Sequence, residues 1–352
     1  MPPEITRVAT TDIAEMMAPG PERRMALPGF ADEFVDFPHF IIRITEKIWH
    51  EREVDRVLEW YADDCPIHTL AGDITGAQTV VDNTWATLDA FPDRRLDGDN
   101  VIWSDEGGGA FYSSHLITSK MTNQGDSEFG PATGRKVRIQ TIADCLCANN
   151  QVVEEWLVRD NLALVQGLGF DPDEIAVRQA AGDQARGESL IQFHAEARGT
   201  AQDKPTPVPG GERAVDVAVS ALVHTFGGDT AAQAGVYDFR VRASYPGNAQ
   251  LYGPDEVSAW LAPLRKALPD LRLRVDHVAE IPYLGEAWDV ALRWSAAGIH
   301  GGDGRYGPAS GAPVYLLGVS HFRVMNGRVR EEVTLWDDLA VRRQIAAARR
   351  AK

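Results

Sequence analysis

The hexapeptide FGPATG at 129–134 recurs as YGPASG at 306–311, and one fixed offset of 177 residues relates the two copies. Without a gap, segments 129–168 and 306–345 share twelve identities in forty positions. In both, the hexapeptide is followed by a β-rich run, a pair of glutamates and an aspartate. This period far exceeds that of a solenoid repeat, so each unit is a whole domain. The pattern therefore predicts a tandem duplication.

Composition along the chain suggests four parts. Residues 1–38 carry many Pro, Met and charged residues and are predicted to form an N-terminal arm that could wrap the other unit. Residues 39–170 and 213–352 are predicted to be the two copies. Between them, residues 171–212 begin as a charged helix and end in the Pro/Gly linker KPTPVPGG.

The overall balance of charge limits the classes of partner. The formal net charge is -16, which argues against a nucleic-acid partner because phosphate neutralisation needs clustered Lys and Arg. It also argues against docking on anionic lipid, and no apolar run is long enough to cross a bilayer. The three cysteines and the absence of a secretory signal favour the cytoplasm.

The hydrophobic pattern of unit one changes from helical to extended along its length. PHFIIRITEKIWHEREVDRVLEWY has apolar residues at helical spacing, followed by a strand, a turn at Gly72-Asp73 and a short helix ending near Pro92. Four strand-like segments follow, the last two joined by the turn ANNQ. The second unit repeats the order, with Asn326-Gly327 as its final turn. This order predicts an α+β fold, with helices on one face of a curved, mostly antiparallel sheet and a cone between them that suits one small ligand.

The order of elements and the ending EEWLVRDNLALVQGLG resemble the SnoaL-like polyketide cyclase branch of the NTF2-like superfamily. That branch typically ends in a strand bearing Trp and Asp and a short helix with Gln-Leu-Gly. The second unit departs from the pattern, because Val333 stands where the first has Trp156 and the terminal Leu-Gly is missing. The resemblance implies two tandem NTF2-like (cystatin-like) cone-shaped domains. The residues that match the ending in the first unit are Trp156, Asp160, Gln166, Leu168 and Gly169.

By resemblance, members of this family carry out cofactor-free acid/base chemistry in the cone. An apolar cavity suits that work because desolvation moves the pKa of a carboxylate toward neutrality. The catalytic candidates in the first unit are Asp144, Asp160, His68 and His115. Each has a structural alternative: for Asp160 the cap of the helix that follows it, for Asp144 a structural ion pair or hydrogen bond, and for either histidine an ordinary core or surface position.

The second copy changes most of these candidates. Asp160 aligns with Asp337 and so is retained, which favours a structural contribution from this aspartate. The other three candidates change at the fixed offset: Asp144 aligns with His321, His115 with Leu292 and His68 with Tyr245. The predicted substrate-binding residues are Trp156, Trp85 and Tyr112 in the first unit and Tyr245, His321 and Trp294 in the second.

The leading hypothesis is a lyase, isomerase or cyclase acting on a small carbonyl-type or cyclic metabolite in the first cone, with no cofactor and no metal. The alternatives are a non-catalytic ligand-binding or dimerisation protein, or an epoxide or ester hydrolase on the same fold. The expected partner is the small-molecule substrate, with no nucleic acid and no membrane, and the two units are expected to form an internal pseudo-dimer that could itself dimerise. The run GDGRYG at 302–307 fits G-x-G-x-x-G but precedes a strand, so it is interpreted as a loop.

Overall fold

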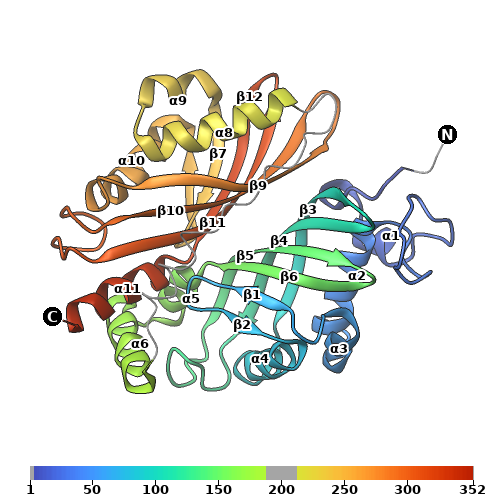
Figure 1. Ribbon diagram of the computed structural model, residues 1–352, viewed down its shortest axis with the longest axis horizontal. Helices are drawn as coiled ribbons and strands as arrows, with labels where there is room; N and C mark the ends of the chain where they lie inside the picture. The colour runs from blue at the N-terminus through green and yellow to red at the C-terminus, as the bar shows by residue number, and fades with distance from the viewer. Residues whose placement is uncertain (1–3, 188–211, 352) are drawn as a thin grey trace. The chain divides into compact units, whose positions relative to one another are not determined.

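The computed structural model of the chain describes residues 4–187 and 212–351. The chain forms two compact units, and each contains a six-stranded sheet with helices against one face (Figure 1). The predicted α+β class and the two tandem domains are confirmed. The predicted linker KPTPVPGG lies outside the described residues. Unit 1 consists of Met1–Thr69 and Asp73–Leu157, and unit 2 of Leu70–Gly72 and Val158–Lys352.

Unit 1 begins with short helices and ends with four long strands. Its sheet has the order β2-β1-β6-β5-β4-β3, with β1 parallel to β6 and the β1–β2, β3–β4 and β4–β5 pairs antiparallel. The elements are η1 (Val8–Thr10), α1 (Ile13–Met17), α2 (Phe37–Trp49), η2 (Val54–Arg56), α3 (Val57–Trp60), β1 (Pro66–His68), β2 (Ile74–Thr75), α4 (Ala77–Ala90), β3 (Arg95–Gly107), β4 (Ala110–Thr122), β5 (Lys136–Ala148) and β6 (Gln151–Arg159).

Local sequence accounts for the ends of these elements. Asp36 caps the N-terminus of α2: its side chain accepts a hydrogen bond from the backbone N–H of His39 at 2.9 Å, and proline occupies the first turn. The β5–β6 hairpin turns at Asn149 and Asn150, both with positive φ, as a tight two-residue turn requires.

The N-terminal segment packs into the core of unit 1 itself. Val8, Met16, Phe30 and Phe34 are buried with the apolar face of α2. The rings of Phe30 and Phe40 lie 5.0 Å apart in an edge-to-face arrangement, a favourable geometry for aromatic pairs. The segment preceding α2 therefore completes the hydrophobic core of unit 1.

Unit 2 repeats this plan after two additional helices. Its sheet has the order β8-β7-β12-β11-β10-β9, with β7 parallel to β12. Its elements are α5 (Asn161–Leu168), α6 (Pro172–Arg186), α8 (Glu212–Gly227), α9 (Thr230–Val236), β7 (Tyr237–Tyr245), β8 (Ala249–Tyr252), α10 (Gly253–Ala267), β9 (Arg272–Pro282), β10 (Trp288–Ile299), β11 (Pro313–Met325), β12 (Arg328–Trp336) and α11 (Asp338–Arg350).

The strand registers align the two copies residue by residue. From β3 and β9 onward the offset is 177, because His115 faces Ala143 across the ladder as Leu292 faces Ser320. In the first strand of each unit it is 176, since Ile67 pairs with Glu155 and Ala243 with Glu332. The structural counterpart of His68 is thus Ser244 rather than Tyr245.

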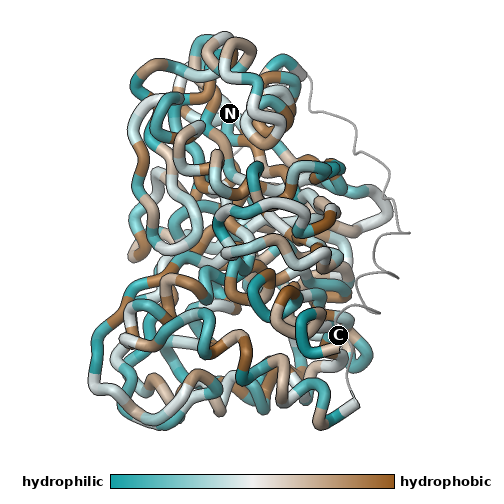
Figure 2. Tube along the Cα trace, turned by 90° about the vertical axis from the view of Figure 1, so that its left-hand side faces the viewer, coloured by the Kyte–Doolittle hydropathy of each residue, from teal (hydrophilic) through white to brown (hydrophobic). Residues whose placement is uncertain are grey.

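Hydrophilic and hydrophobic residues are interspersed along the chain (Figure 2). Within the described ranges, no helix is both long and apolar enough to cross a bilayer. The loop at 302–307 carries an isolated bridge between Gly304 and Gly307, matched by Ser127 and Gly130 in the first copy. It precedes a strand, as expected for the loop interpretation.

Candidate active site on the inner face of unit 1

The sheet of unit 1 has two chemically different faces. Successive side chains on a strand point to opposite faces. Phe111, Ala143 and Cys145 belong to the core that contains α2, so they define the inner face, which packs against the helices. The intervening residues, such as Tyr112 and Asp144, lie on the outer face.

A buried glutamate on the inner face pairs with a partly buried tyrosine. Glu155 is opposite Ile67, a core residue of β1, and the Tyr61 hydroxyl hydrogen-bonds to Glu155. Burial, and then the nearby Glu155 charge, raises the pKa of Tyr61 well above its usual value. The phenol therefore stays protonated and can donate to the carboxylate.

Three thiols surround this pair. Cys65, Cys145 and Cys147 are all buried and unpaired. Burial and the Glu155 charge raise the pKa of Cys65 to about 12, and those of Cys145 and Cys147 well above the ordinary value. Since only the thiolate is a strong nucleophile, these cysteines provide an uncharged lining rather than a reactive group. Glu155 is thus the charged group at the centre of a largely neutral surface.

A second set of polar side chains lies further along the inner face. Ser113, His115 and Thr141 are 0%, 3% and 4% exposed. Within the described part of the chain, Ser113 Oγ, His115 Nε2 and Thr141 Oγ1 have no hydrogen-bond partner. Burial lowers the pKa of His115 to about 3, so its imidazole is neutral near pH 7.

Of the four predicted catalytic residues, His115 faces the helices and Asp144 faces the opposite side. Asp144 accepts a hydrogen bond from Tyr112, and a second from Ser114 at 2.5 Å, both donors on β4. The predicted substrate-binding residue Tyr112 is therefore bound to the predicted base Asp144 on the outer face. The structure does not bring Asp144 and His115 together.

His68 also lies on the outer face, because its neighbour Ile67 belongs to the core. Its ring nitrogens contact Asp73 at 3.0 Å and Glu154 at 3.1 Å, and its ring stacks on Trp156 at 5.4 Å. Burial alone would lower the pKa of His68, but the two carboxylates raise it to about 9. At neutral pH both ring nitrogens of this imidazolium contact carboxylates. Trp156, a predicted substrate-binding residue, stacks on the imidazolium ring.

Asp160 has the capping geometry considered as its structural alternative. Its carboxylate accepts from the backbone N–H of Ala163 at 3.0 Å in α5, and from Gly247 and Asn248 at 2.9 and 3.1 Å. All four residues belong to unit 2. Burial raises the pKa of Asp160, partly offset by these backbone donors. Asp337 caps α11 in the same way through Ala340.

Unit 2 also buries a glutamate that accepts from tyrosine. Glu332 accepts from Tyr237 at 2.7 Å, from Tyr245 at 2.6 Å and from Thr334 at 2.6 Å. Burial raises its pKa, and the three hydroxyl donors oppose that rise. The predicted substrate-binding residue Tyr245 thus donates its hydroxyl hydrogen bond to the Glu332 carboxylate within the core.

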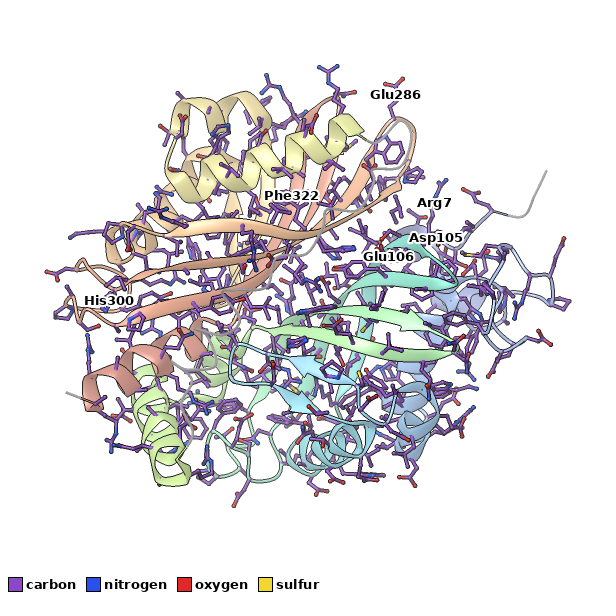
Figure 3. All side chains as sticks on the ribbon, in the orientation of Figure 1. Arg7, Asp105, Glu106, Glu286, His300 and Phe322 are labelled. Atoms are coloured by element: carbon purple, nitrogen blue, oxygen red, sulfur yellow. The ribbon has the colours of Figure 1, made fainter. Side chains whose placement is uncertain are left out.

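Trp294 fills the inner face of unit 2. Its indole N–H donates to Ser320 at 3.0 Å, and its ring meets Phe226 of α8 edge-on at 4.9 Å. A Cβ on Gly318 would lie 2.2 Å from the indole, so only glycine leaves room for this ring. Phe322 points toward the same helices, while His300 lies at the far end of the strands (Figure 3).

The two remaining predicted binding residues occupy different positions. Trp85 lies on α4 and is 43% exposed. His321 lies opposite Ala291 on β10, on the outer face of unit 2. A shallow hollow of about 140 Å³ in unit 2 is lined by Arg213, Glu286 and Trp288, and it is smaller than a typical ligand pocket.

Glu155 was not among the sequence-based candidates. The pair Glu154-Glu155 recurs as Glu331-Glu332, and strand alternation places one member of each pair inward. That alternation was a usable signal. The pairing of Tyr61 with Glu155 could not be inferred, because the two residues are distant in sequence and meet only where the segment around Tyr61 runs parallel to β6, bridged to Val152.

Comparisons with known proteins bear on both units. A family model described as SnoaL-like polyketide cyclase matches residues 39–168 and 227–345, which together exceed half the chain. No curated protein matches the chain.

Several crystal structures are similar to part of the chain. A putative SnoaL-like polyketide cyclase from Jannaschia sp. CCS1 is 23% identical, and the match covers 41% of this chain and 98% of that one with a TM-score of 0.35. AclR, a putative hydroxylase from Streptomyces galilaeus, is 17% identical, and the match covers 39% of this chain and 86% of that one with a TM-score of 0.33. IdmH, a putative polyketide cyclase from Streptomyces antibioticus, is 18% identical, and the match covers 37% of this chain and 96% of that one with a TM-score of 0.31.

Proposed function

Because the chain belongs to the SnoaL-like polyketide cyclase family, we propose that it is a cofactor-free enzyme that moves a proton on a small carbonyl compound at the inner face of unit 1. The observation that carries this proposal is the Glu155 carboxylate, buried beside Tyr61 among three uncharged thiols. Apolar surroundings disfavour the charged form of a carboxylate, which makes a buried carboxylate a more effective proton acceptor.

In this proposal Glu155 takes a proton from the carbon next to the substrate carbonyl, and charge develops on the carbonyl oxygen. The carboxylic acid then returns the proton to carbon, which leaves the enzyme unchanged. Tyr61 hydrogen-bonds to Glu155 and holds it in place. Preorganised uncharged donors near the carbonyl oxygen would stabilise the developing charge in this water-poor environment.

Asp144 and His68 were predicted to be catalytic, but this proposal gives neither of them a part in proton transfer. Both lie on the outer face, where Asp144 binds Tyr112 and His68 contacts Asp73. We assign them to the support of the sheet rather than to proton transfer. Asp160 is assigned to the cap of α5, for which its hydrogen bonds are sufficient.

The proposal can be tested without knowledge of the natural substrate. Base catalysis next to a carbonyl exchanges the α-protons of a ketone for deuterium in D₂O, which NMR follows directly. We expect the full chain to accelerate this exchange for cyclic ketones such as cyclohexanone. Glu155→Gln should lower the rate by about 10²–10⁴-fold, the usual contribution of a general base.

The two units provide the control for this experiment. Glu332→Gln replaces the counterpart of Glu155 in unit 2 and should leave exchange unchanged. An equal rate in Glu155→Gln and the unsubstituted chain would contradict the proposal, as would the absence of acceleration for every cyclic ketone in the series.

A non-catalytic ligand-binding function is the second candidate. It is favoured by the placement of Asp144 and His68 on the face opposite to His115, which separates the predicted acid and base groups. This alternative predicts that ketones bind to the chain while their α-protons exchange only at the rate seen in buffer.

A further inference from the structure

We propose that Ser113, His115 and Thr141 form the binding site of unit 1 for the oxygen atoms of an uncharged ligand. This inference rests on the proposed function, since it names the side chains that would hold the substrate near Glu155. It adds a ligand class and a set of contacts, and it can be tested by binding alone.

The first argument is the unusual state of these three side chains. Each is more than nine-tenths buried on the inner face, yet Ser113 Oγ, His115 Nε2 and Thr141 Oγ1 lack a partner among the described residues. Buried polar atoms are normally hydrogen-bonded, and leaving one unpaired costs about 1–3 kcal/mol. Three such groups on neighbouring strands are therefore expected to have partners from a bound molecule.

The second argument is that the fold does not need these groups. In unit 2 the ladder positions of Ser113, His115 and Thr141 are held by Val290, Leu292 and Gly318. The hydroxyl and imidazole groups are gone, and Trp294 occupies the space above Gly318. Unit 2 thus keeps the same strand register without these three polar groups, so their presence in unit 1 requires an explanation other than folding.

The third argument concerns Gly98, which faces His115. A Cβ on Gly98 would lie 2.8 Å from His115 Nε2 and 2.7 Å from Ile42 Cδ1. Strand β3 shifts register between Gly98 and Asn100, so the bulge falls at this position. Bulges are frequent beside active sites, where they redirect side chains.

Unit 2 keeps the equivalent bulge but changes the pair of side chains. Its register shift leaves Asp276 without a partner residue on β10. The residues that correspond to Gly98 and His115 are Val275 and Leu292. A glycine and a histidine in unit 1 thus correspond to two aliphatic residues in unit 2. The residue at position 98 thus changes together with the residue at position 115. Glycine at 98 leaves room for the His115 imidazole, so Gly98 acts as a positioning residue for His115.

The chemistry of the three groups determines the class of ligand. Two hydroxyls and a neutral imidazole offer hydrogen-bond donors and acceptors but no charge. They suit carbonyl and hydroxyl oxygens. A carboxylate ligand would have no cation among them and would be repelled by Glu155, while an ammonium ligand would bind to Glu155 rather than to this site.

The test compares ligands that share one ring and differ in one group. Cyclohexanone, cyclohexane, cyclohexanecarboxylate and cyclohexylammonium would be titrated into the full chain and followed by ligand-detected NMR. We expect cyclohexanone to bind most tightly. The double substitution Gly98→Val/His115→Leu, which transplants the pair from unit 2, should weaken that binding roughly tenfold.

A second variant guards against misfolding of the first. Ser113→Ala/Thr141→Val removes two hydroxyls with little change of shape, and it should also weaken cyclohexanone binding several-fold. Equal affinity of the unsubstituted chain and both variants for cyclohexanone would overturn the inference. Binding of cyclohexane as tight as that of cyclohexanone would do the same, and the three groups would then contact ordered water only.

Failure of this site and failure of the proposed function give different results. Glu155→Gln should keep cyclohexanone binding, because Glu155 is not among the three contacts. Side-chain-dependent binding without proton exchange would leave the site intact and contradict the proposed function. Proton exchange that persists unchanged in both variants would support the proposed function and contradict the site.

Discussion

The inner faces of the two units differ far more than their backbones. Both sheets have the same strand order, an equivalent bulge and a buried glutamate bound by tyrosine. In unit 2, the Trp294 ring lies on the inner face and donates to Ser320, and Glu332 accepts from three hydroxyl groups. In unit 1, Ser113, His115 and Thr141 bury polar atoms at positions where unit 2 has Val290, Leu292 and Gly318. The difference shows which features the fold requires and which were available for binding and chemistry.

The largest expected effect concerns the side chain that fills unit 2. Trp294→Ala should lower the free energy of unfolding of unit 2 by about 3–5 kcal/mol, the usual range when a buried aromatic is truncated. Hydrogen exchange followed by mass spectrometry would locate the loss in β10 and β11. Trp85→Ala is the control, because its partly exposed side chain should contribute no more than about 0.5 kcal/mol. An equal loss of stability in Trp294→Ala and Trp85→Ala would contradict the assignment of Trp294 to the core of unit 2.

Acid should distinguish the units through His115. Burial holds the pKa of this imidazole near 3, below its ordinary value of 6.5. The neutral histidine is favoured in the folded state, so its contribution is complete above pH 6.5 and is lost as the pH falls. At pH 4 unit 1 should lose about 3 kcal/mol from this group.

His115→Leu is the matched variant for this acid effect, since Leu292 occupies the same position in unit 2. The variant should flatten the acid dependence of hydrogen exchange in unit 1 and leave unit 2 unchanged. The same acid sensitivity in His115→Leu as in the unsubstituted chain would show that other groups dominate.

The helix caps are expected to matter in the same way in both copies. Asp160→Ala removes a carboxylate that accepts from Ala163, Gly247 and Asn248, and it should destabilise α5 by about 2 kcal/mol. Asp337→Ala should fray α11 through loss of the bond from Ala340. Hydrogen exchange at 161–168 and 338–350 measures both. An unchanged rate in α5 would restore the case for a catalytic role of Asp160.

The smallest expected effect is an alkaline one confined to unit 1. The pKa of His68 is raised to about 9, so the stability it provides is complete below pH 6.5 and is lost as the pH rises through 9. Its side chain is 28% exposed, and solvent screening limits the effect to about 1 kcal/mol. His68→Gln should remove this dependence in unfolding measurements between pH 6.5 and 9. Ser244 provides no such group in unit 2.

The sequence was sufficient to predict most of the architecture. The repeat at 129–134 and 306–311 predicted the duplication, hydrophobic periodicity predicted the order of elements, and the ending EEWLVRDNLALVQGLG supported the SnoaL-like family, which the family match confirms. These features are local or periodic, so they can be read without coordinates.

The arrangement of the site was harder to predict. Strand alternation gives two possible faces but does not say which one the helices cover, so Asp144 and His115 could not be assigned to opposite sides. The one-residue change of offset in the first strand misaligned His68 with Tyr245. The pairing of Tyr61 with Glu155 and the contact of Gly98 with His115 depend on strands brought together by tertiary structure.

The central claim is that a ligand binds to Ser113, His115 and Thr141 at the inner face of unit 1 and not to the corresponding positions of unit 2. Hydrogen exchange of the full chain with and without saturating cyclohexanone tests it most directly. The account predicts added protection in β4 and β5, at 110–122 and 136–148, and none in β10 and β11. Equal protection in both units, or protection in unit 2 alone, would contradict it.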